Sequence, residues 1–321
     1  MIRELDTILV KEQGTFGTPE TTLVGTDYFP ALLDSSVEVN TEFQDVELQS
    51  GGYDQDIAVR GNVNAGVELS CYMRSIGAGQ TDYPDYQLLA KAAGMAASTT
   101  NSGAKYRHII VPSTTNIGKD LTVWKYFGGI GTSESVLRKV GNVVGDWKIA
   151  GEANKPAVFS LVNGIGVYTS DAAATLPTVT KNRSLIPAVN TLVAYINNVQ
   201  YKVLNFEFSG GNSAAQYIDS TTSYGFGRSD LTKKKGTFMV KVYADASLAL
   251  HLATALGGDV LSATALSIRW GATADRKIQA TSLYPQMKDV KTEDSGGLTV
   301  FTITGILTRN DIAVTANVDV A

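Results

Sequence analysis

Hydrophobic and polar residues alternate with a period of two along most of the chain. In the segment SVEVNTEF, at residues 36–43, one face carries branched and aromatic residues and the other carries Glu38, Asn40 and Glu42. Because successive side chains of a strand point to opposite faces, this pattern predicts a strand with one buried face. The same pattern recurs at residues 120–127, 156–164, 203–210, 236–244, 265–272 and 297–307.

Two segments depart from this alternation and predict helices. The first, PDYQLLAKAAG at residues 84–94, has Pro84 near its first turn and Gly94 at its stop position. The second, at residues 245–258, has Asp245 as an N-cap and Gly257 after its end. One helix in each half of a strand-rich chain predicts a mainly β fold, a sandwich or barrel with a helix packed against it.

The two halves of the chain also resemble each other. Four matches in the same order lead us to infer an internal duplication, because similar strand composition explains one match but not an ordered series. SVEV matches NFEF, which aligns Glu38 with Glu207, and the other pairs are ELSCY with MVKVY, LAKAAG with LATALG, and AVFSLVNGI with TVFTITGI.

This duplication divides the chain into five predicted parts. We expect two tandem β-sandwich or barrel modules, each with one packed helix, joined by an Ala-, Thr- and Pro-rich linker. The predicted parts are an N-terminal arm at 1–34, module 1 at 35–168, a linker at 169–196, module 2 at 197–310 and a C-terminal tail at 311–321.

Composition narrows the classes of function. The chain has 321 residues, 44% of them hydrophobic, and a net charge of −4, which is typical of a globular protein and argues against a nucleic-acid binder. The single cysteine, Cys71, excludes an internal disulfide, and we expect it to be buried. No apolar run approaches the roughly 20 residues that span a bilayer, and the charged N-terminus predicts no signal peptide.

A search for chemistry finds no catalytic, metal or cofactor motif. The only histidines are His108, in a predicted strand, and His251, on the second predicted helix. HExxH, CxxC, GxSxG and Walker-type patterns are absent from the sequence. A pair of carboxylates for glycoside hydrolysis stays open, but no segment gathers acids with a sugar-binding aromatic lining. We therefore expect a protein that is not an enzyme and that takes no cofactor or small-molecule substrate.

The opening segment VKEQGTFGTPE, followed by Tyr28, Phe29 and Pro30, resembles the start of the tail tube (major tail) proteins of long-tailed bacteriophages. The middle segments DLTVWKYFGG and VLRKVGNVVGDWKIAGEANKPAVFSLVNGIG are similar to a strand pair, small-residue turn and hairpin of that family. The resemblance covers most of the chain, although no single motif is sharply specific.

The resemblance implies a structural virion protein that self-assembles into stacked rings, a conduit for DNA ejection. If each chain holds two modules, three chains close a pseudo-sixfold ring; if it holds one, a hexamer does. The tape measure protein and double-stranded DNA would occupy the lumen without tight binding, and no membrane is involved. The protein would reside in the virion tail after assembly in the host bacterial cytoplasm.

The resemblance also assigns roles to particular residues. Phe16, Tyr28 and Phe29 would contact a neighbouring ring through the arm, so we expect a chain without residues 1–30 to fold but not to assemble. The candidate lumen-facing residues are Glu38, Asn40, Glu42 and Glu207, whose charge would repel phosphate. An ordinary solvent-facing sheet surface explains the same alternation equally well.

Three other readings stay open. A carbohydrate- or receptor-binding sandwich would expose aromatic residues in loops, but Trp124, Trp147 and Trp270 all lie in strand-like segments. A hub or terminator ring of the tail would share the fold of a tube protein. An enzyme of unknown type is disfavoured by the missing motifs.

Overall fold

The computed structural model describes most of the chain. The described residues are 6–44, 59–74, 84–102, 105–113, 120–128, 135–179, 192–196, 199–222, 224–233, 235–246, 248–249, 266–271, 277–308 and 311–316. Most of the second predicted helix, including His251, lies outside them. At its predicted start the Ala249 N–H donates to the carbonyl of Asp245 over 2.9 Å.

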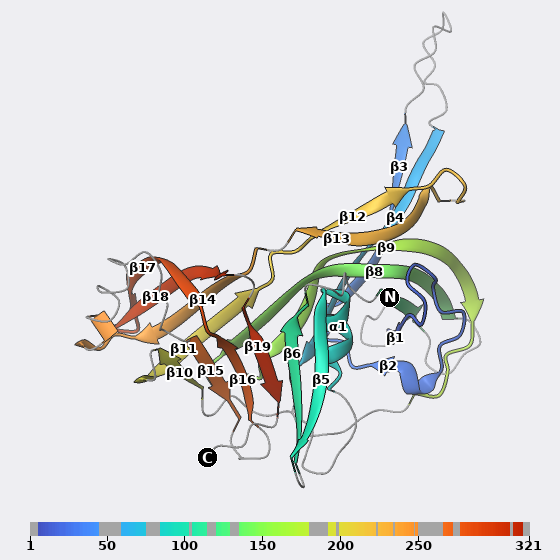
Figure 1. The fold of residues 1–321 in the computed structure, drawn as a ribbon. Coiled ribbons are helices and arrows are strands. Elements are labelled where there is room, and N and C mark those ends of the chain that lie inside the picture. The colour runs from blue at the N-terminus through green and yellow to red at the C-terminus, as the bar shows by residue number, and fades with distance from the viewer. Residues whose placement is uncertain are drawn as a thin grey trace, which may run out of the picture.

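The fold is mainly β, as the alternation predicts, and all seven predicted strands are present (Figure 1). In chain order the strands are β1 (Thr7–Glu12), β2 (Tyr28–Phe29), β3 (Ser36–Gln44), β4 (Val59–Tyr72), β5 (Met95–Ser102), β6 (Lys105–Pro112), β7 (Leu121–Phe127), β8 (Ser135–Glu152), β9 (Val158–Ala174), β10 (Val193–Ile196), β11 (Val199–Ser209), β12 (Ser213–Ile218), β13 (Phe226–Lys233), β14 (Thr237–Tyr243), β15 (Leu266–Trp270), β16 (Ile278–Ser282), β17 (Pro285–Ser295), β18 (Leu298–Leu307) and β19 (Ala313–Ala316).

The first predicted helix is confirmed as α1 (Tyr86–Ala92). Its buried face packs on the sheet, where the Tyr86 ring stacks on Phe159 with the centroids 5.9 Å apart. Gly94 follows the helix with φ of 75°, the left-handed conformation expected at a helix stop. Within the described part of the chain, no helix is long and apolar enough to cross a membrane.

One layer of the molecule is a continuous antiparallel sheet of eight strands. Its order is β3-β4-β9-β8-β11-β14-β18-β17. The long strand β8 joins the two halves, because one of its edges pairs with β9 and the other pairs first with β7 and then with β11. Figure 1 shows β8 and β9 as long curved ribbons that connect the two ends of the molecule.

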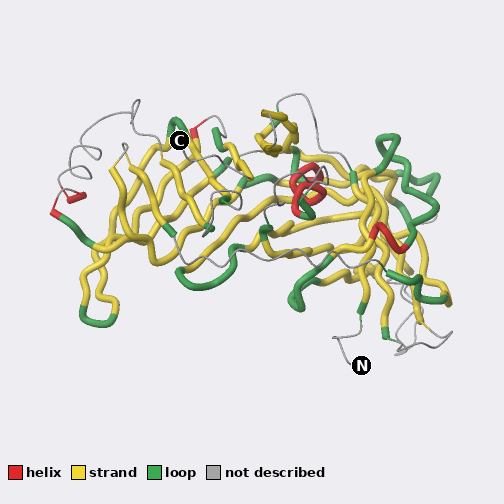
Figure 2. The backbone as a smooth tube through the Cα atoms, turned by 90° about the horizontal axis from the view of Figure 1, so that it is seen from below, coloured by secondary structure: helices red, strands yellow, loops and turns green. Residues whose placement is uncertain are grey.

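A second layer mixes strands from both halves in the order β5-β6-β19-β16-β15-β10. The layers pack face to face: the ring of Phe206 on β11 lies against that of Trp270 on β15, with the centroids 5.2 Å apart. Residues from both halves belong to one continuous buried cluster. Seen from below, the molecule is elongated (Figure 2).

Strands from the two halves pair in the same order, β3-β4-β9-β8 in the first and β11-β14-β18-β17 in the second. Their registers also agree where the sequences match, since Cys71 lies opposite Phe159 and Val242 lies opposite Phe301. Beside these pairs, the Met73 N–H donates to the Ala157 carbonyl (2.8 Å) and the Ala244 N–H to the Thr299 carbonyl (2.9 Å).

The predicted N-terminal arm differs from the structure. Strand β1 pairs with β7 and β2 of its own chain, and Leu9 is fully buried. Phe29 is only 2% exposed. The apolar residues at 8–10 are few, but every one of them faces the interior, which makes the segment a core strand rather than a free arm.

Other predicted boundaries also shift. Residues 169–174 of the predicted linker are the end of β9, and residues 193–196 are strand β10. Residues 313–316 of the predicted tail form β19, which pairs with β16 and β6. The Ala-rich end of β9 lacks the period-two alternation that marks a strand, so the sequence did not indicate it.

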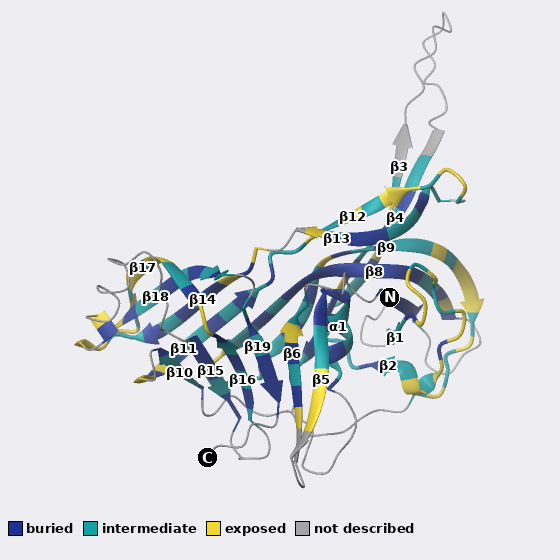
Figure 3. Ribbon diagram, viewed as in Figure 1, coloured by how far each residue is buried: buried dark blue, intermediate teal, exposed yellow. Residues whose placement is uncertain are grey.

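Hairpin β12–β13 leaves the second half between β11 and β14 and lies over the first half (Figure 1). The Gln216 side-chain N–H donates to the Gly166 carbonyl (2.9 Å), and the Asn142 side-chain N–H donates to the Gly227 carbonyl (3.1 Å). Figure 3 shows that the hairpin is exposed mainly toward its tip. It therefore fastens one half of the molecule to the other.

Candidate assembly surfaces

Two edges of the eight-stranded sheet carry the strands β3 and β17. Among the described residues, β3 pairs only with β4, and β17 pairs only with β18. The two strands lie at opposite ends of the molecule, β17 on the left and β3 at the upper right of Figure 1. An edge strand presents backbone N–H and C=O groups that can pair with another chain.

The two four-stranded sets, β3-β4-β9-β8 and β11-β14-β18-β17, are joined to each other within the chain. Here β8 and β11 pair antiparallel, with Lys148 opposite Ser209 and Ala150 opposite Glu207. The Lys148 ammonium lies 2.9 Å from a Glu207 carboxylate oxygen, and both side chains are just over one-third exposed. We call this junction the internal seam: the β8–β11 pairing at residues 148–152 and 205–209.

The structure places the candidate lumen-facing residues in different settings. Glu38 and Asn40 are exposed on one face of β3, as the alternation predicts. The backbone of Glu42 continues β3, but its side chain lies outside the described residues. Glu207 lies on the second set and is ion-paired with Lys148. The acidic candidates thus do not form one common negative surface, because Glu207 has a cation beside it.

The arm candidates also separate. Phe16 is 48% exposed, and the Arg228 guanidinium lies over its ring at 5.2 Å. The same guanidinium lies 4.4 Å from the ring centroid of Tyr217 on β12. Tyr28 is half-buried, whereas Phe29 is in the core. Phe16 and Tyr28 therefore have surface to offer a neighbour, and Phe29 has almost none in this conformation.

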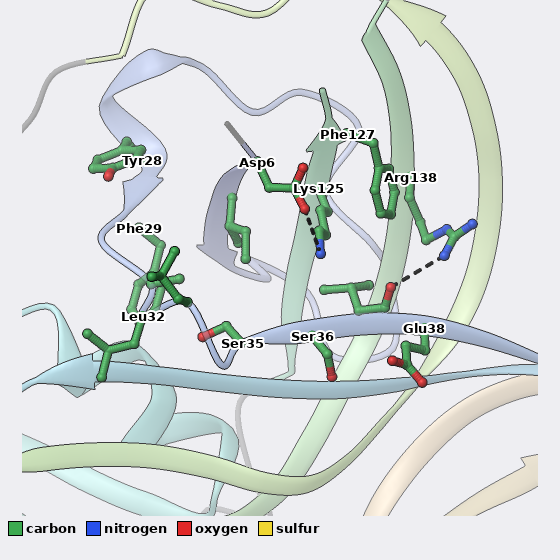
Figure 4. Close-up of a pocket in the computed structure, with 14 residues that line it drawn as sticks. Asp6, Tyr28, Phe29, Leu32, Ser35, Ser36, Glu38, Lys125, Phe127 and Arg138 are labelled. Carbon is green, nitrogen blue, oxygen red and sulfur yellow. Dashed lines mark hydrogen bonds and ion pairs between the residues drawn. The ribbon is translucent and has the colours of Figure 1, made fainter. Parts of the chain in front are cut away.

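A cavity of about 400 Å³ lies between β3 and the strands β1, β7 and β8 (Figure 4). Its lining combines apolar side chains, among them Phe29 and Leu32, with four charged ones. The charged residues are Asp6, Glu38, Lys125 and Arg138.

The cations of this cavity already have partners. Lys125 lies 3.1 Å from Asp6, and Arg138 makes a two-point contact with Asp171 at 3.0 and 3.1 Å. Arg138 also donates to the Val37 carbonyl of β3 over 3.3 Å. The Phe127 ring lies beside both cations, 4.9 Å from each. This network supports the side of β3 that faces the cavity and accounts for Asp6, Lys125 and Arg138 in the lining without a ligand.

Asp120 fastens the N-terminal loop beneath the β12–β13 hairpin. It is 1% exposed, and one of its oxygens accepts the Gly17 N–H over 3.2 Å. Burial raises the pKa of the Asp120 carboxyl to about 6; the Gly17 hydrogen bond opposes the shift, and the nearby Asp230 adds to it. This carboxyl is therefore held in a site that favours its neutral form.

Asp146 fastens the base of the same hairpin. Its carboxylate accepts the N–H groups of Trp147 (2.8 Å), Gly211 (3.0 Å) and Asn212 (3.0 Å) and the hydroxyl of Ser209 (3.1 Å). Burial raises the pKa of this carboxyl although the four hydrogen bonds oppose the shift. Asp146 thus positions the segment that leaves the internal seam.

The residues considered for chemistry are dispersed. Cys71 is buried, as predicted, and burial raises the pKa of its thiol well above the usual value. The ring of His108 on β6 lies 2.9 Å from the Thr99 hydroxyl. In the part of the chain that the structure describes, no group of three His, Cys, Asp or Glu residues could hold a metal ion. Trp124, Trp147 and Trp270 lie in strands and are at most 7% exposed.

Sequence reasoning missed Lys148 and Arg138. Lys148 meets Glu207 only because two strands from different halves pair, and Arg138 meets Val37 across the cavity. Partners so far apart along the chain leave no local pattern. The inferred duplication could have indicated the seam, since it predicts that each half carries equivalent edges.

Comparison with protein-family models and with curated protein sequences found no match to this chain.

Proposed function

We propose that this chain is a tail tube protein of a long-tailed bacteriophage, a structural protein that assembles with copies of itself into stacked rings. The observation that carries the proposal is the eight-stranded sheet, built from two four-stranded sets of the same order and register and ending in the edges β3 and β17. The internal seam is already a junction between two such sets.

The two sets are interpreted as tandem modules, near residues 35–168 and 197–310, although the core runs through both. Three copies would then join three times eight, or 24, inner strands into a closed pseudo-sixfold ring. Closure would pair both open edges of the eight-stranded sheet and remove the hazard of nonspecific association there. A hexamer is the alternative if the halves do not act as equivalent modules.

The sheet face that carries Glu38 and Glu207 would line the lumen. On this face Lys148 pairs with Glu207 at 2.9 Å, and Lys241 pairs with Glu293 at 2.6 Å. Cations that are occupied by neighbouring carboxylates contribute little attraction for phosphate. Such a surface would let double-stranded DNA and the tape measure protein pass without tight binding.

The tryptophans weigh against a carbohydrate-binding sandwich. All three lie in strands and their side chains are buried, whereas sugar recognition needs exposed aromatic faces. An enzyme is not proposed, because the described residues supply no assembled catalytic group and the proposal needs none.

Negative-stain electron microscopy of the concentrated, purified protein tests the proposal. Hollow filaments with a regular ring repeat are expected. Single closed rings that do not stack would instead indicate a hub or terminator protein of the tail. Persistent monomers at high concentration would overturn the proposal, and binding of sugars by those monomers would favour the receptor-binding reading.

A further inference from the structure

The internal seam is a template for a second junction between two copies of the chain. This inference rests on the proposed function, because it assumes that copies join through their sheet edges. In the seam, β8 of the first set pairs antiparallel with β11 of the second. In the inferred duplication β17 is the counterpart of β8, and β3 is the counterpart of β11. Both counterparts lie at the open edges of the sheet.

Equivalent residues on β8 and β17 follow from their hairpin partners. Lys148 lies opposite Ser160, the residue after Phe159. Lys291 lies opposite Thr302, the residue after Phe301. Because AVFSL and TVFTI match in sequence, Lys291 occupies the position of Lys148. The cation of the internal seam therefore has a counterpart on the open edge.

The β3 and β11 positions are matched through their neighbouring strands. In the first set, Val37 on β3 lies opposite Val67 on β4, which in turn lies opposite Gly164 on β9. In the second set, Phe208 on β11 lies opposite Phe238 on β14, which in turn lies opposite Gly305 on β18. The two glycines match in the sequence repeat. This makes Val37 the equivalent of Phe208, and Glu38 the equivalent of Ser209.

This structural register differs by two residues from the sequence match of Glu38 with Glu207. A shift of two residues keeps each side chain on the same face of its strand, so both glutamates still face the same side. We adopt the pairing register because backbone partners on three adjacent strands define it.

In the internal seam Lys148 lies opposite Ser209. We propose that β17 of one copy pairs antiparallel with β3 of the next, with Lys291 opposite Glu38 of the partner subunit. Among the described residues Glu38 forms no ion pair, and Lys291 is 71% exposed with its ammonium 3.8 Å from Asp289. A cation facing an anion across neighbouring strands stabilises their pairing, and two like charges destabilise it.

The geometry also predicts the kind of assembly. The junction uses two different edges, β17 and β3, so it is heterologous and repeats from copy to copy until a ring closes. Joining would bring strand N–H groups to the β3 edge. There the Arg138 contact with the Val37 carbonyl, at 3.3 Å, is a long hydrogen bond that a strand partner can replace.

Disulfide trapping tests this register directly. The chain has one cysteine, Cys71, which is fully buried, so introduced cysteines report without interference. The double variant Glu38→Cys, Lys291→Cys should form a covalent ladder up to the ring size on a non-reducing gel after mild oxidation. The control Glu68→Cys, Lys291→Cys moves one thiol from β3 to the neighbouring strand β4, opposite Ser36. The two thiols are then more than about 10 Å apart, which exceeds disulfide reach.

Charge exchange gives a second readout. Glu38→Lys or Lys291→Glu alone should raise the critical concentration for assembly about threefold to tenfold, and the two together should restore it. The fold of each variant is checked by circular dichroism before assembly is measured.

The outcomes separate the two proposals. Wild-type filaments without the expected ladder, together with unchanged assembly of both single charge variants, would overturn the register and leave the tube function standing. A covalent dimer of Glu38→Cys alone would show that two β3 edges meet and would also overturn it. A wild-type protein that never assembles would overturn the proposed function and this inference with it.

Discussion

The sets β3-β4-β9-β8 and β11-β14-β18-β17 pair alike but end differently. In the first set the outer edge of β8 is covered by β7 and β11 of the same chain. In the second set, β17 has β18 as its only partner among the described residues. One arrangement of strands is therefore completed internally at one end and left open at the other. The difference shows where an added copy can continue the sheet.

The additional strands of the first set give the largest expected effect. Removing residues 1–30 deletes β1, β2 and five buried apolar side chains, Ile8, Leu9, Val10, Leu23 and Phe29. Each buried apolar side chain contributes about 1.5–3 kcal/mol, so the truncated chain should lose on the order of 5 kcal/mol or more. We expect it to be insoluble or unfolded, which corrects the prediction of a folded protein that only fails to assemble.

A single substitution in β1 tests whether this strand belongs to the core. Leu9→Ala should cost about 2–4 kcal/mol in urea unfolding because Leu9 is fully buried. The matched control Leu33→Ala lies in the same N-terminal region but is 70% exposed, and should change stability little. Equal stability of both variants would mean that β1 does not belong to the core in solution.

A pair of equivalent glycines probes the shared register. A Cβ at Gly164 would lie 2.2 Å from the Val67 carbonyl oxygen, and one at Gly305 would lie 2.2 Å from the Gln286 carbonyl oxygen. Gly164→Ala and Gly305→Ala should each cost about 1–3 kcal/mol, because a backbone must move to admit the methyl group. Gly66→Ala, whose Cβ would meet only the Asn40 side chain at 3.6 Å, is the control. A large loss at one glycine and none at the other would break the equivalence.

The buried carboxyl of Asp120, which precedes β7, should make the stability of the fold depend on pH. Its pKa is about 6 in the fold against an ordinary value of 3.8, so burial favours its protonated form. The contribution of protonated Asp120 to the free energy of unfolding is fully present below about pH 4 and is lost as pH rises through about 6. Asp120→Asn should therefore be more stable than wild type at pH 7, by up to about 3 kcal/mol, and the difference should vanish near pH 4.

Unfolding in urea between pH 4 and pH 7 measures this difference. Asp219→Asn supplies a control of the opposite sign, because hydrogen bonds from Thr221 lower the pKa of the Asp219 carboxyl. Its wild-type contribution is present at neutral pH and lost as pH falls. A difference in unfolding free energy between wild type and Asp120→Asn that stays constant at every pH would contradict the raised pKa of Asp120.

The smallest effect is expected where the hairpin of the second half touches the N-terminal loop. Arg228→Ala removes the contacts with the Phe16 and Tyr217 rings, at 5.2 and 4.4 Å, and a 3.1 Å ion pair with Asp230. Arg228 and the two rings are largely exposed, so we expect the melting temperature to fall by only about 1–2 °C. Arg228→Lys keeps the charge and should recover part of the loss in a thermal melt. A fall of more than about 5 °C would contradict the expectation of a weak surface contact.

Much of the fold was predictable because strands and helices leave local patterns. The alternation at 36–43 and 297–307 predicted β3 and β18, and the capping residues predicted α1. The burial of Phe29 was not predictable, because the Gly-, Thr- and Pro-rich residues before it carry no periodic signal. The ion pair of Lys148 with Glu207 was also missed, since its partners meet only after two distant strands pair.

Taken alone, the amino-acid sequence determined that this chain is strand-rich and that Cys71 is buried. These properties follow from composition and from periods of two and 3.6 residues, which act over a few neighbours. The tertiary structure decided which strands share an edge, which glutamate has a cation beside it and which strands end the eight-stranded sheet among the described residues. Such choices depend on backbone pairing between residues far apart in the chain, and no local pattern records that pairing.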